Sequence, residues 1–446
     1  MKSIYPALII FICAAIFRLT FLDLIEFKLD EARDVYEMVN FYRQPHLFQL
    51  GPIQSTGVYN PPLWYYFLTI ISLPSRDPQY LSFMMGLLNS LAVAAFYLVV
   101  RKFYGQKVGV AAGLLLAFSP WAILFSRKIW APDLIFPLMV PLFYILHKLF
   151  LDKTYTAVYK MNFFWISLLL SLLAQLHASG LFLAVVSIIV ITIITVIQKI
   201  KVSWKGAGLG LLISLIPLLP YLAYQIQTGC ADCQAFFSYQ SEERQFDTNN
   251  FLRPFQLING SSYHLVLGDD YEIFLAQFPV IKFFNMLFLL EFTLGILGII
   301  YILRAQREDT SKNIIVSKVG SLPPKAGSNN NLFLLIYLGV VPLLYFISKT
   351  PAHLYYFLIL APVSILLYAL GIAYLGRVSK NLWIPTFVGM TVVVINIIFE
   401  ISFYQFLSEK QNIQGDYGPV YRLTRQKASS DDELIRAETY LRLFME

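Results

Sequence analysis

Long apolar runs recur along the whole chain, and short polar segments separate them. A helix needs about 20 apolar residues to cross a bilayer core about 30 Å thick. Runs of about that length lie near 4–22, 80–100, 108–126, 132–150, 162–179, 181–198, 206–226, 281–303, 332–348, 354–375 and 383–404. The pattern predicts an all-α polytopic membrane protein with about eleven transmembrane helices. The first run is expected to be a retained span, because no small-residue cleavage site follows it.

Basic residues mark alternate loops between these runs. Short cytoplasmic loops of membrane proteins carry an excess of Lys and Arg, and this bias predicts orientation. Such residues gather near 101–107, 148–160, 199–205, 304–325 and 377–380. The predicted extracytoplasmic parts are therefore loops 23–79 and 227–280 and the tail 405–446.

Three polar regions complete the predicted organisation around a transmembrane domain over 1–404. The run 63–73 is too short to span and is expected to lie in the interface, as a helix of the first outer loop. Segment 304–331 is rich in Gly, Pro, Ser and Asn toward its end, which is typical of a linker, here cytoplasmic. In the tail, Ser-Asp-Asp-Glu at 430–433 predicts a short capped helix.

Composition excludes a soluble class and narrows the partners. The chain is 57% hydrophobic and 14% charged, whereas soluble domains carry about 25% charged residues. Mean hydropathy is +0.62. The net charge of +7 does not indicate nucleic acid, because the basic residues lie between apolar runs and form no binding patch. The expected surroundings are the lipid bilayer of a cell (inner) membrane.

An acidic motif follows the first span, where segment 28–35 reads KLDEARDV. Carboxylates so near a membrane surface are costly unless they are solvated or paired. One interpretation is a solvated helix start with an internal Asp–Arg pair. The functional one makes Asp30 a general base that takes a proton from an acceptor hydroxyl. Glu31 is then a partner that shifts its pKa or helps to bind a cation.

A second acid, Asp133, begins the run 132–150 beside two cations, Arg127 and Lys128. Asp at a helix N-terminus is an ordinary cap. The functional alternative places Asp133 across a cavity from Asp30. Arg127 and Lys128 would then attract the phosphate of a lipid carrier.

Two histidines and a cysteine pair are further candidates. His177 and His353 lie at predicted outer ends of spans, where a structural role and a functional one are both open. Cys230 and Cys233 form a CxxC pair in an outer loop. A zinc site would need two more ligands, and a thioredoxin-like site would need a βαβ setting. A local disulfide is the expected state.

The order of motifs carries a family resemblance over roughly residues 1–375. After KLDEARDV come GPIQSTGVYNPPLWYY at 51–66, SP at 119–120, SRKIWAPD at 126–133, QLH at 175–177, PLLPY at 217–221, and HLYYF at 353–357 with Pro362. The chain resembles bacterial glycosyltransferases of the protein-mannosyltransferase type, which are similar to aminoarabinose transferases. These proteins form part of the membrane-embedded C-type superfamily.

The resemblance implies transfer of a sugar from a polyprenyl-phosphate donor at the extracytoplasmic face, by inverting displacement. The acceptor would be a glycolipid, a cell-surface glycan or a protein. The family's acidic motif carries over to Asp30 and Glu31, and its second acid to Asp133. Related aminoarabinose transferases have Lys where this chain has Asn60, so the phosphate must find another cation. The expected donor-phosphate residues are Arg33, Arg127, Lys128, His353, Tyr355 and Tyr356.

Two questions stay open in the sequence. The expected substrate pocket contains Asp34, Tyr59, Asn60, Gln175 and His177. Metal dependence varies in the superfamily; if Mg²⁺ or Mn²⁺ is used, its ligands are expected among Asp30, Glu31 and Asp133. The alternative function is a transporter or a flippase for a lipid-linked sugar, without covalent chemistry. Its inverted repeats and broken midplane helices are not detected here.

Overall fold

The computed structural model describes residues 4–151, 159–197, 199–240, 246–284, 288–311, 331–350, 353–381 and 383–445. Helices make up almost all of the regular structure in these ranges, and β-pairing there is limited to isolated bridges. Every backbone amide and carbonyl in a lipid core must be bonded internally, which favours helices. The chain therefore forms an all-α bundle.

In the described residues, seven helical segments are long and apolar enough to cross a membrane. They are α4 (Pro78–Tyr104), η2 with α7 (Ala131–Phe150), α9 (Ala178–Ile197), α10 to α11 (Trp204–Gln227), α16 to α17 (Pro279–Arg304), η7 with α19 (Leu354–Val378) and α20 (Trp383–Lys410). Shorter apolar helices occupy the four other predicted ranges: α1 (Ile4–Arg18), α5 (Gln106–Ala117), and parts of α8 and α18 (Met161–Leu176 and Phe333–Ile347). The chain is a multi-pass membrane protein, and the count of eleven spans stays a prediction.

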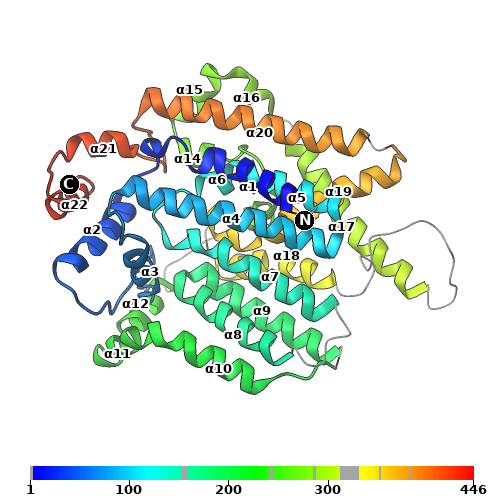
Figure 1. Cartoon of the computed structure of the whole chain (residues 1–446), viewed down its shortest axis with the longest axis horizontal. Coiled ribbons are helices and arrows are strands. Elements are labelled where there is room, and N and C mark those ends of the chain that lie inside the picture. Colours follow the sequence, from blue (N-terminus) through cyan, green and yellow to red (C-terminus); the bar gives the residue numbers. More distant parts are fainter. Residues whose placement is uncertain are drawn as a thin grey trace.

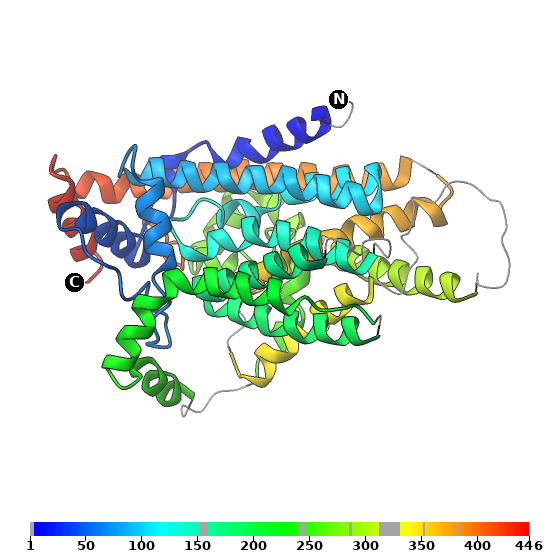
Figure 2. The same cartoon turned by 60° about the horizontal axis from the view of Figure 1, so that its bottom comes forward.

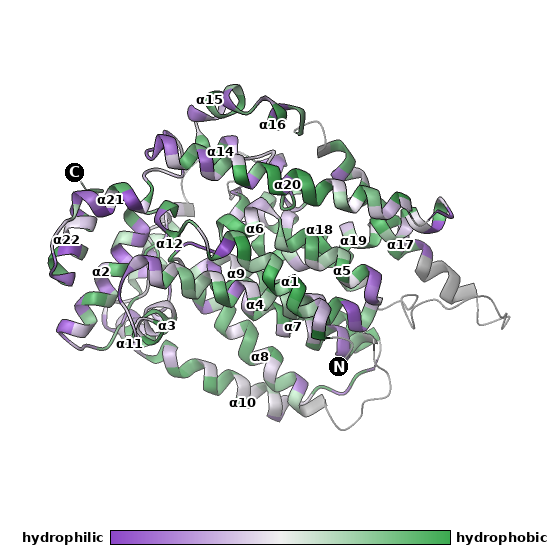
Figure 3. Ribbon diagram, turned by 45° about the horizontal axis from the view of Figure 1, so that its top comes forward, coloured by the Kyte–Doolittle hydropathy of each residue, from purple (hydrophilic) through white to green (hydrophobic). Residues whose placement is uncertain are grey.

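The outer segments gather at one end of the bundle. Figures 1 and 2 show α2 (Leu29–Arg43), α3 (Leu63–Ile71), α12 (Ala231–Gln240) and the C-terminal helices at the left end, and the N-terminus toward the other end. Figure 3 shows that α21 and α22 at this end are largely hydrophilic, whereas the long helices of the bundle are largely hydrophobic. This arrangement brings loops that are far apart in sequence onto one face.

Two glycines allow close packing at the centre of the bundle. A Cβ atom built at Gly371 of α19 would lie 2.0 Å from the carbonyl oxygen of Leu294, and one at Gly298 of α17 would lie 2.0 Å from that of Leu367. Small residues at helix contacts let backbones approach in membrane bundles. These two glycines let α19 pack closely against α17. Helix α19 therefore lies deep in the molecule, beneath the outer end.

The tail after α20 packs back onto the first outer loop. The amide of Tyr421 donates to the carbonyl of Ile25 at 2.9 Å, and Phe27 donates to Pro419 at 3.3 Å. The predicted capped helix is α22 (Glu433–Arg442), whose N-terminus is capped by Asp432. Helix α21 (Tyr421–Lys427) precedes it. The tail is therefore part of the folded outer end.

The predicted cytoplasmic linker differs at its start. Helix α17 (Phe288–Ser311) continues through the polar sequence after Arg304, so the first part of the predicted segment 304–331 is helical. Residues 312–330 lie outside the described residues.

Candidate active site

Helix α2 presents Asp30 at the rim of the outer end. The η1 turn (Leu22–Leu24) separates α2 from the first span, and the carboxylate of Glu31 caps α2 by accepting from the backbone amide of Lys28 at 3.1 Å. This cap turns Asp30 outward on the first helical turn. The Asp30 side chain is 43% exposed and lies 2.9 Å from the Arg33 guanidinium. Asp30 is thus an accessible carboxylate held by one cation.

Lys128 is enclosed by carboxylates beneath this rim. Its ammonium nitrogen lies 2.8 Å from Glu26 and 3.3 Å from Glu31, and all three side chains are buried. Burial would raise the pKa of Glu26, but the ammonium groups of Lys128 and Lys28 hold it below its ordinary value. Burial raises the pKa of Glu31, although Lys128 opposes this effect. The Lys128 charge is therefore already matched inside the protein.

Asp133 lies behind this cluster. It is 3% exposed in the η2 turn (Ala131–Leu134), and neither carboxylate oxygen has a hydrogen-bond partner. Its side chain lines a small cavity together with Asn89 and Ser126. Lys128 and Glu31 act on it electrostatically. Asp133 thus belongs to the buried charge cluster and not to the rim that carries Asp30.

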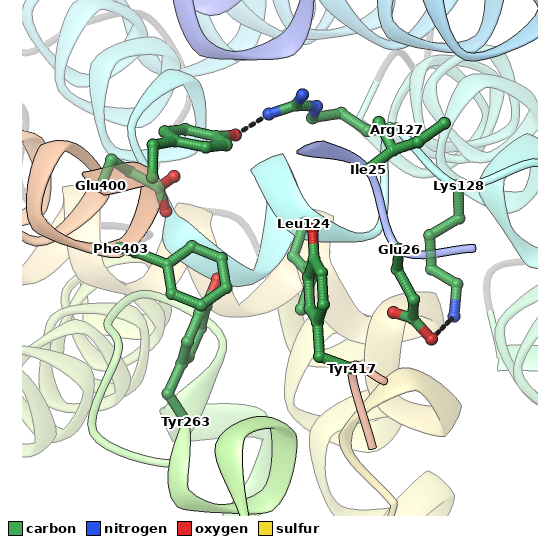
Figure 4. A pocket seen from close by; sticks show the side chains of 10 residues that line it. Ile25, Glu26, Leu124, Arg127, Lys128, Tyr263, Glu400, Phe403 and Tyr417 are labelled. Carbon is green, nitrogen blue, oxygen red and sulfur yellow. Dashed lines mark hydrogen bonds and ion pairs between the residues drawn. The ribbon is translucent and has the colours of Figure 1, made fainter. Parts of the chain in front are cut away.

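Arg127 points into a different pocket. Its guanidinium donates to the carbonyls of Thr20 at 2.8 Å and Phe21 at 2.6 Å and to the hydroxyl of Tyr404. Figure 4 shows this pocket with Glu26 and Lys128 on one side and Glu400 on the other. Arg127 therefore joins the end of the first span to α20, and the structure does not bring it to Asp30.

An aromatic wall consists of Trp130, His177, His353, Tyr355 and Tyr356. The Trp130 and Tyr355 rings are 5.0 Å apart, His177 stacks on Tyr356 at 5.8 Å, and His353 stacks on Tyr355 at 5.5 Å. Asp30 and Asp416 act electrostatically on Tyr355.

The wall also contacts the buried cluster. Lys128 lies 4.5 Å from the centre of the Trp130 ring. Partial burial lowers the pKa of His353 below its ordinary value, so its imidazole is neutral at pH 7. Aromatic faces and a neutral imidazole next to an accessible carboxylate can bind a polar ring and accept its proton.

The remaining predicted pocket residues have structural partners. Asp34 is fully buried and accepts from the indole of Trp64 at 2.6 Å and the hydroxyl of Tyr65 at 3.3 Å. Burial raises the pKa of Asp34 well above its ordinary value, although Arg33 opposes this effect. Gln175 donates to the carbonyl of Ser214 at 2.8 Å and so ties α8 (Tyr159–Leu176) to α10 (Trp204–Leu215).

Tyr59 and Asn60 belong to a hairpin in the first outer loop. The amide group of Asn60 accepts from Gln54 at 2.6 Å and donates to Pro52 at 3.1 Å, which closes the hairpin. The Tyr59 backbone amide donates to Asp232 at 3.2 Å. The structure thus places both residues in loop contacts and not on the aromatic wall.

Sequence patterns missed two residues of this region. Glu26 pairs with Lys128, and its only signal is an acid four residues before Asp30. Arg253 begins α13 (Arg253–Gln256) and acts electrostatically on His353. It lies in the long outer loop 227–280, and no recognisable motif surrounds it there. Arg253 brings a further cation to the aromatic wall.

The expected metal ligands do not converge. Within the described ranges, no group of three or more His, Cys, Asp or Glu side chains is placed to hold a metal ion. Asp30 lies at the rim with Arg33, whereas Glu31 is bound to Lys128 and to the Lys28 amide. An ammonium group in the middle of a carboxylate cluster competes with a cation for the same oxygens. We derive no step through a metal ion.

Comparison with known proteins shows which solved structures share this architecture. No family model matches the sequence, and no curated protein matches it. Apo ArnT from Cupriavidus metallidurans aligns with a TM-score of 0.53 at 14% identity, covering 99% of this chain and 75% of that one. ArnT bound to undecaprenyl phosphate aligns with a TM-score of 0.51 at 12% identity, covering 99% of this chain and 76% of that one. The chain therefore has the same fold as these two ArnT structures.

The apo oligosaccharyltransferase of Archaeoglobus fulgidus is also similar, with a TM-score of 0.50 at 14% identity. The alignment covers 98% of this chain and 59% of that one. The resemblance predicted from the motifs is confirmed at the level of the fold. Activity and substrates at such low identity must be argued from the site itself.

Proposed function

We propose that the protein is a glycosyltransferase that moves a sugar from a polyprenyl-phosphate carrier to an acceptor hydroxyl. The reaction is placed at the extracytoplasmic face of the cell membrane, and the acceptor is a glycolipid, a cell-surface glycan or a protein. A polyprenyl donor is insoluble in water, so its enzyme must lie in the bilayer. The bound undecaprenyl phosphate of ArnT, which shares the fold, supports this donor class.

The observation that carries the proposal is the position of Asp30. Its carboxylate is 43% exposed, pairs with Arg33 at 2.9 Å and acts electrostatically on Tyr355 of the aromatic wall. A general base must be reachable by the proton that it accepts. Glu31, Asp34 and Asp133 are each at most 3% exposed, so Asp30 is the accessible acid among those predicted for the site.

The proposed reaction is a direct displacement. The acceptor oxygen attacks the anomeric carbon of the donor while Asp30 takes the hydroxyl proton. The bond between that carbon and the phosphate oxygen breaks, and the polyprenyl phosphate leaves with the electron pair. A single attack from the face opposite the leaving group inverts the anomeric configuration. Asp30 acts here as a base, so the proposal includes no covalent enzyme intermediate.

The leaving phosphate needs positive charge in the transition state. Lys128 is surrounded by Glu26 and Glu31, so its charge is largely compensated before the donor arrives. Arg33 and Arg253 are better placed, because one lies beside Asp30 and the other near His353. A phosphate that recruits Arg33 also releases Asp30 from its ion pair, which frees the base for the acceptor.

The buried acids act through Lys128 in this proposal. Glu31 caps α2, and Glu31 and Asp133 both face the Lys128 ammonium group. They therefore position the first turn of α2 and the loop that carries Trp130. A change in either residue should alter the geometry of the site without removing the base.

Release of free lipid phosphate tests the proposal. Purified protein in lipid nanodiscs is incubated with a panel of prenyl-phosphate sugars and with lipid, glycan and peptide acceptors. We expect acceptor-dependent release of prenyl phosphate with at least one donor. The matched control is Asp269→Asn, because Asp269 is an exposed outer carboxylate at the start of α15 (Asp270–Gln277).

One outcome would contradict the transferase: movement of a prenyl-phosphate sugar across the bilayer with no release of lipid phosphate, which is the transporter or flippase result. Full activity of the Asp30→Asn variant would instead leave the transferase standing and remove Asp30 as its base.

A further inference from the structure

We propose that Asp232 is a positioning residue for the first outer loop and that the Cys230–Cys233 disulfide holds it in place. The effect on catalysis rests on the function proposed above, whereas the contact itself does not. Asp232 lies on α12, in the second long outer loop, and binds the hairpin 51–60 of the first. Both segments lie at the same end of the molecule in Figure 1.

The Asp232 carboxylate is a buried junction of three segments. It is 6% exposed and accepts from the Tyr59 amide at 3.2 Å, the Tyr221 hydroxyl at 2.6 Å and the Gln225 amide at 2.7 Å. Gln225 also accepts from the backbone amide of Asp232 at 3.2 Å. A buried carboxylate is stable when its oxygens are satisfied in this way, and it then fixes the groups that donate to it.

The disulfide closes the turn that carries this junction. Cys230 and Cys233 are joined, and Asp232 lies between them in the first turn of α12. Gly229 and Cys230 both have left-handed backbones, with φ of 64° and 65°. This backbone conformation is unfavourable for a residue with a side chain, so Cys230 needs support from its surroundings. The covalent link provides that support and keeps Asp232 aimed at Tyr59.

The hairpin is a compact unit that moves with Tyr59. Gly51 donates to Asn60 at 2.7 Å and Gln54 donates to Val58 at 2.9 Å, and Ile53 bridges to Tyr59. Its tip, Gly57, has a φ of 75°, and a Cβ atom built there would lie 3.9 Å from the Cβ atom of Ala235 on α12. The hairpin therefore lies close to α12 at its tip and is bound to it through the Tyr59 amide.

The hairpin leads directly into the helix that supports Asp30. Pro61 and Pro62 connect it rigidly to α3. Trp64 and Tyr65 of α3 hold Asp34, which lies one turn from Asp30 on α2. Arg33 lies 3.8 Å from Asp34 and 2.9 Å from Asp30. Continuous contacts thus run from Asp232 to the proposed base.

Hydrogen exchange of the full-length protein in nanodiscs tests the contact without any substrate. The Asp232→Ala variant and the Cys230→Ser/Cys233→Ser variant should exchange amides of 51–62 about tenfold faster than wild type. Reduction of wild type to two thiols with a phosphine should do the same. Exchange in α4 and α19 should stay unchanged, which separates a local release from global unfolding. Asp269→Ala is the matched control.

A milder variant keeps the test decisive if alanine prevents folding. Asp232→Asn retains an oxygen that can accept from the Tyr59 amide, so it should keep at least half of the protection of 51–62. Unchanged exchange of 51–62 in both Asp232→Ala and the reduced protein would overturn the proposal. So would equal acceleration of 51–62, α4 and α19.

Turnover then tests the consequence for catalysis. With a donor that wild type uses, Asp232→Ala should lower kcat about tenfold and change the donor KM less than about twofold, because the base is misplaced while phosphate binding is kept. Faster exchange with an unchanged kcat would show that the contact does not position the site. If wild type transfers no sugar, the proposed function fails, and the exchange experiment still decides whether Asp232 holds the hairpin.

Discussion

The ammonium group of Lys128 lies 2.8 Å from the carboxylate of Glu26, and the two residues are 102 positions apart in sequence. The pair joins the segment before α2 to the loop before α7, and both side chains are almost fully buried. Since Asp30 follows on α2 and Trp130 follows in the loop, this pair sets the distance between the proposed base and the aromatic wall.

Breaking this pair should cost stability. Glu26→Gln leaves Lys128 with Glu31 and Asp133, and removing one partner of a buried pair typically costs about 3–5 kcal/mol. We expect a clear fall in the thermal unfolding temperature in nanodiscs. Lys128→Met should lower it at least as much, because it leaves Glu26 and Glu31 buried without this cation. Unchanged unfolding temperatures in both variants would argue against the ion pair as a source of stability.

The loss of stability at acidic pH provides a second test of the Glu26–Lys128 pair. Lys128 and Lys28 hold the pKa of Glu26 below its ordinary value despite burial. The stabilisation is therefore present above the unfolded pKa of about 4.3 and is lost as pH falls through the lower folded pKa. Glu26→Gln should flatten this acid part of the stability profile, and an unchanged slope would contradict the assignment.

The sequence predicts the all-α bundle because each span must bond its own backbone and present apolar side chains to lipid, whereas the number of spans stays a prediction. It also selects Asp30 as a candidate base, since an acid directly after an apolar run is costly and therefore informative, and this role stays a prediction. It cannot predict that Glu26 neutralises Lys128, because a contact across 102 positions depends on how the helices pack. Arg253 cannot be predicted for the same reason, because its loop has no periodic pattern.

Asp34 should destabilise the protein as pH rises. Burial raises its folded pKa well above the ordinary value, so the folded state keeps a proton that the unfolded chain releases near pH 4. Stability therefore falls between these two values as pH increases. Asp34→Asn does not titrate, so the difference in stability between this variant and wild type should grow in the variant's favour as pH rises above the unfolded pKa of about 4. Parallel stability curves for the two proteins would contradict this sign.

Asp30→Asn should abolish transfer and leave the fold intact. The amide cannot accept the acceptor proton, and loss of a general base typically costs about 100-fold or more in rate. The side chain is 43% exposed, so its unfolding temperature should match that of Asp269→Asn. Rates are compared by release of prenyl phosphate at saturating donor. A variant that loses both rate and stability would point to a structural role.

We expect Arg253 to bind the donor and Arg127 to stabilise the fold. Arg253 acts on His353 of the aromatic wall and donates to Gln256 at 2.6 Å, so Arg253→Gln should raise the donor KM about tenfold or more and lower the unfolding temperature less than Arg127→Gln does. Arg127 is 4% exposed and binds Thr20, Phe21 and Tyr404. Arg127→Gln should therefore lower the unfolding temperature. Any surviving folded fraction should keep its donor KM, because Arg127 faces the Glu400 pocket. The reverse pattern, a stable Arg127→Gln variant with weakened donor binding, would move the phosphate site to that pocket.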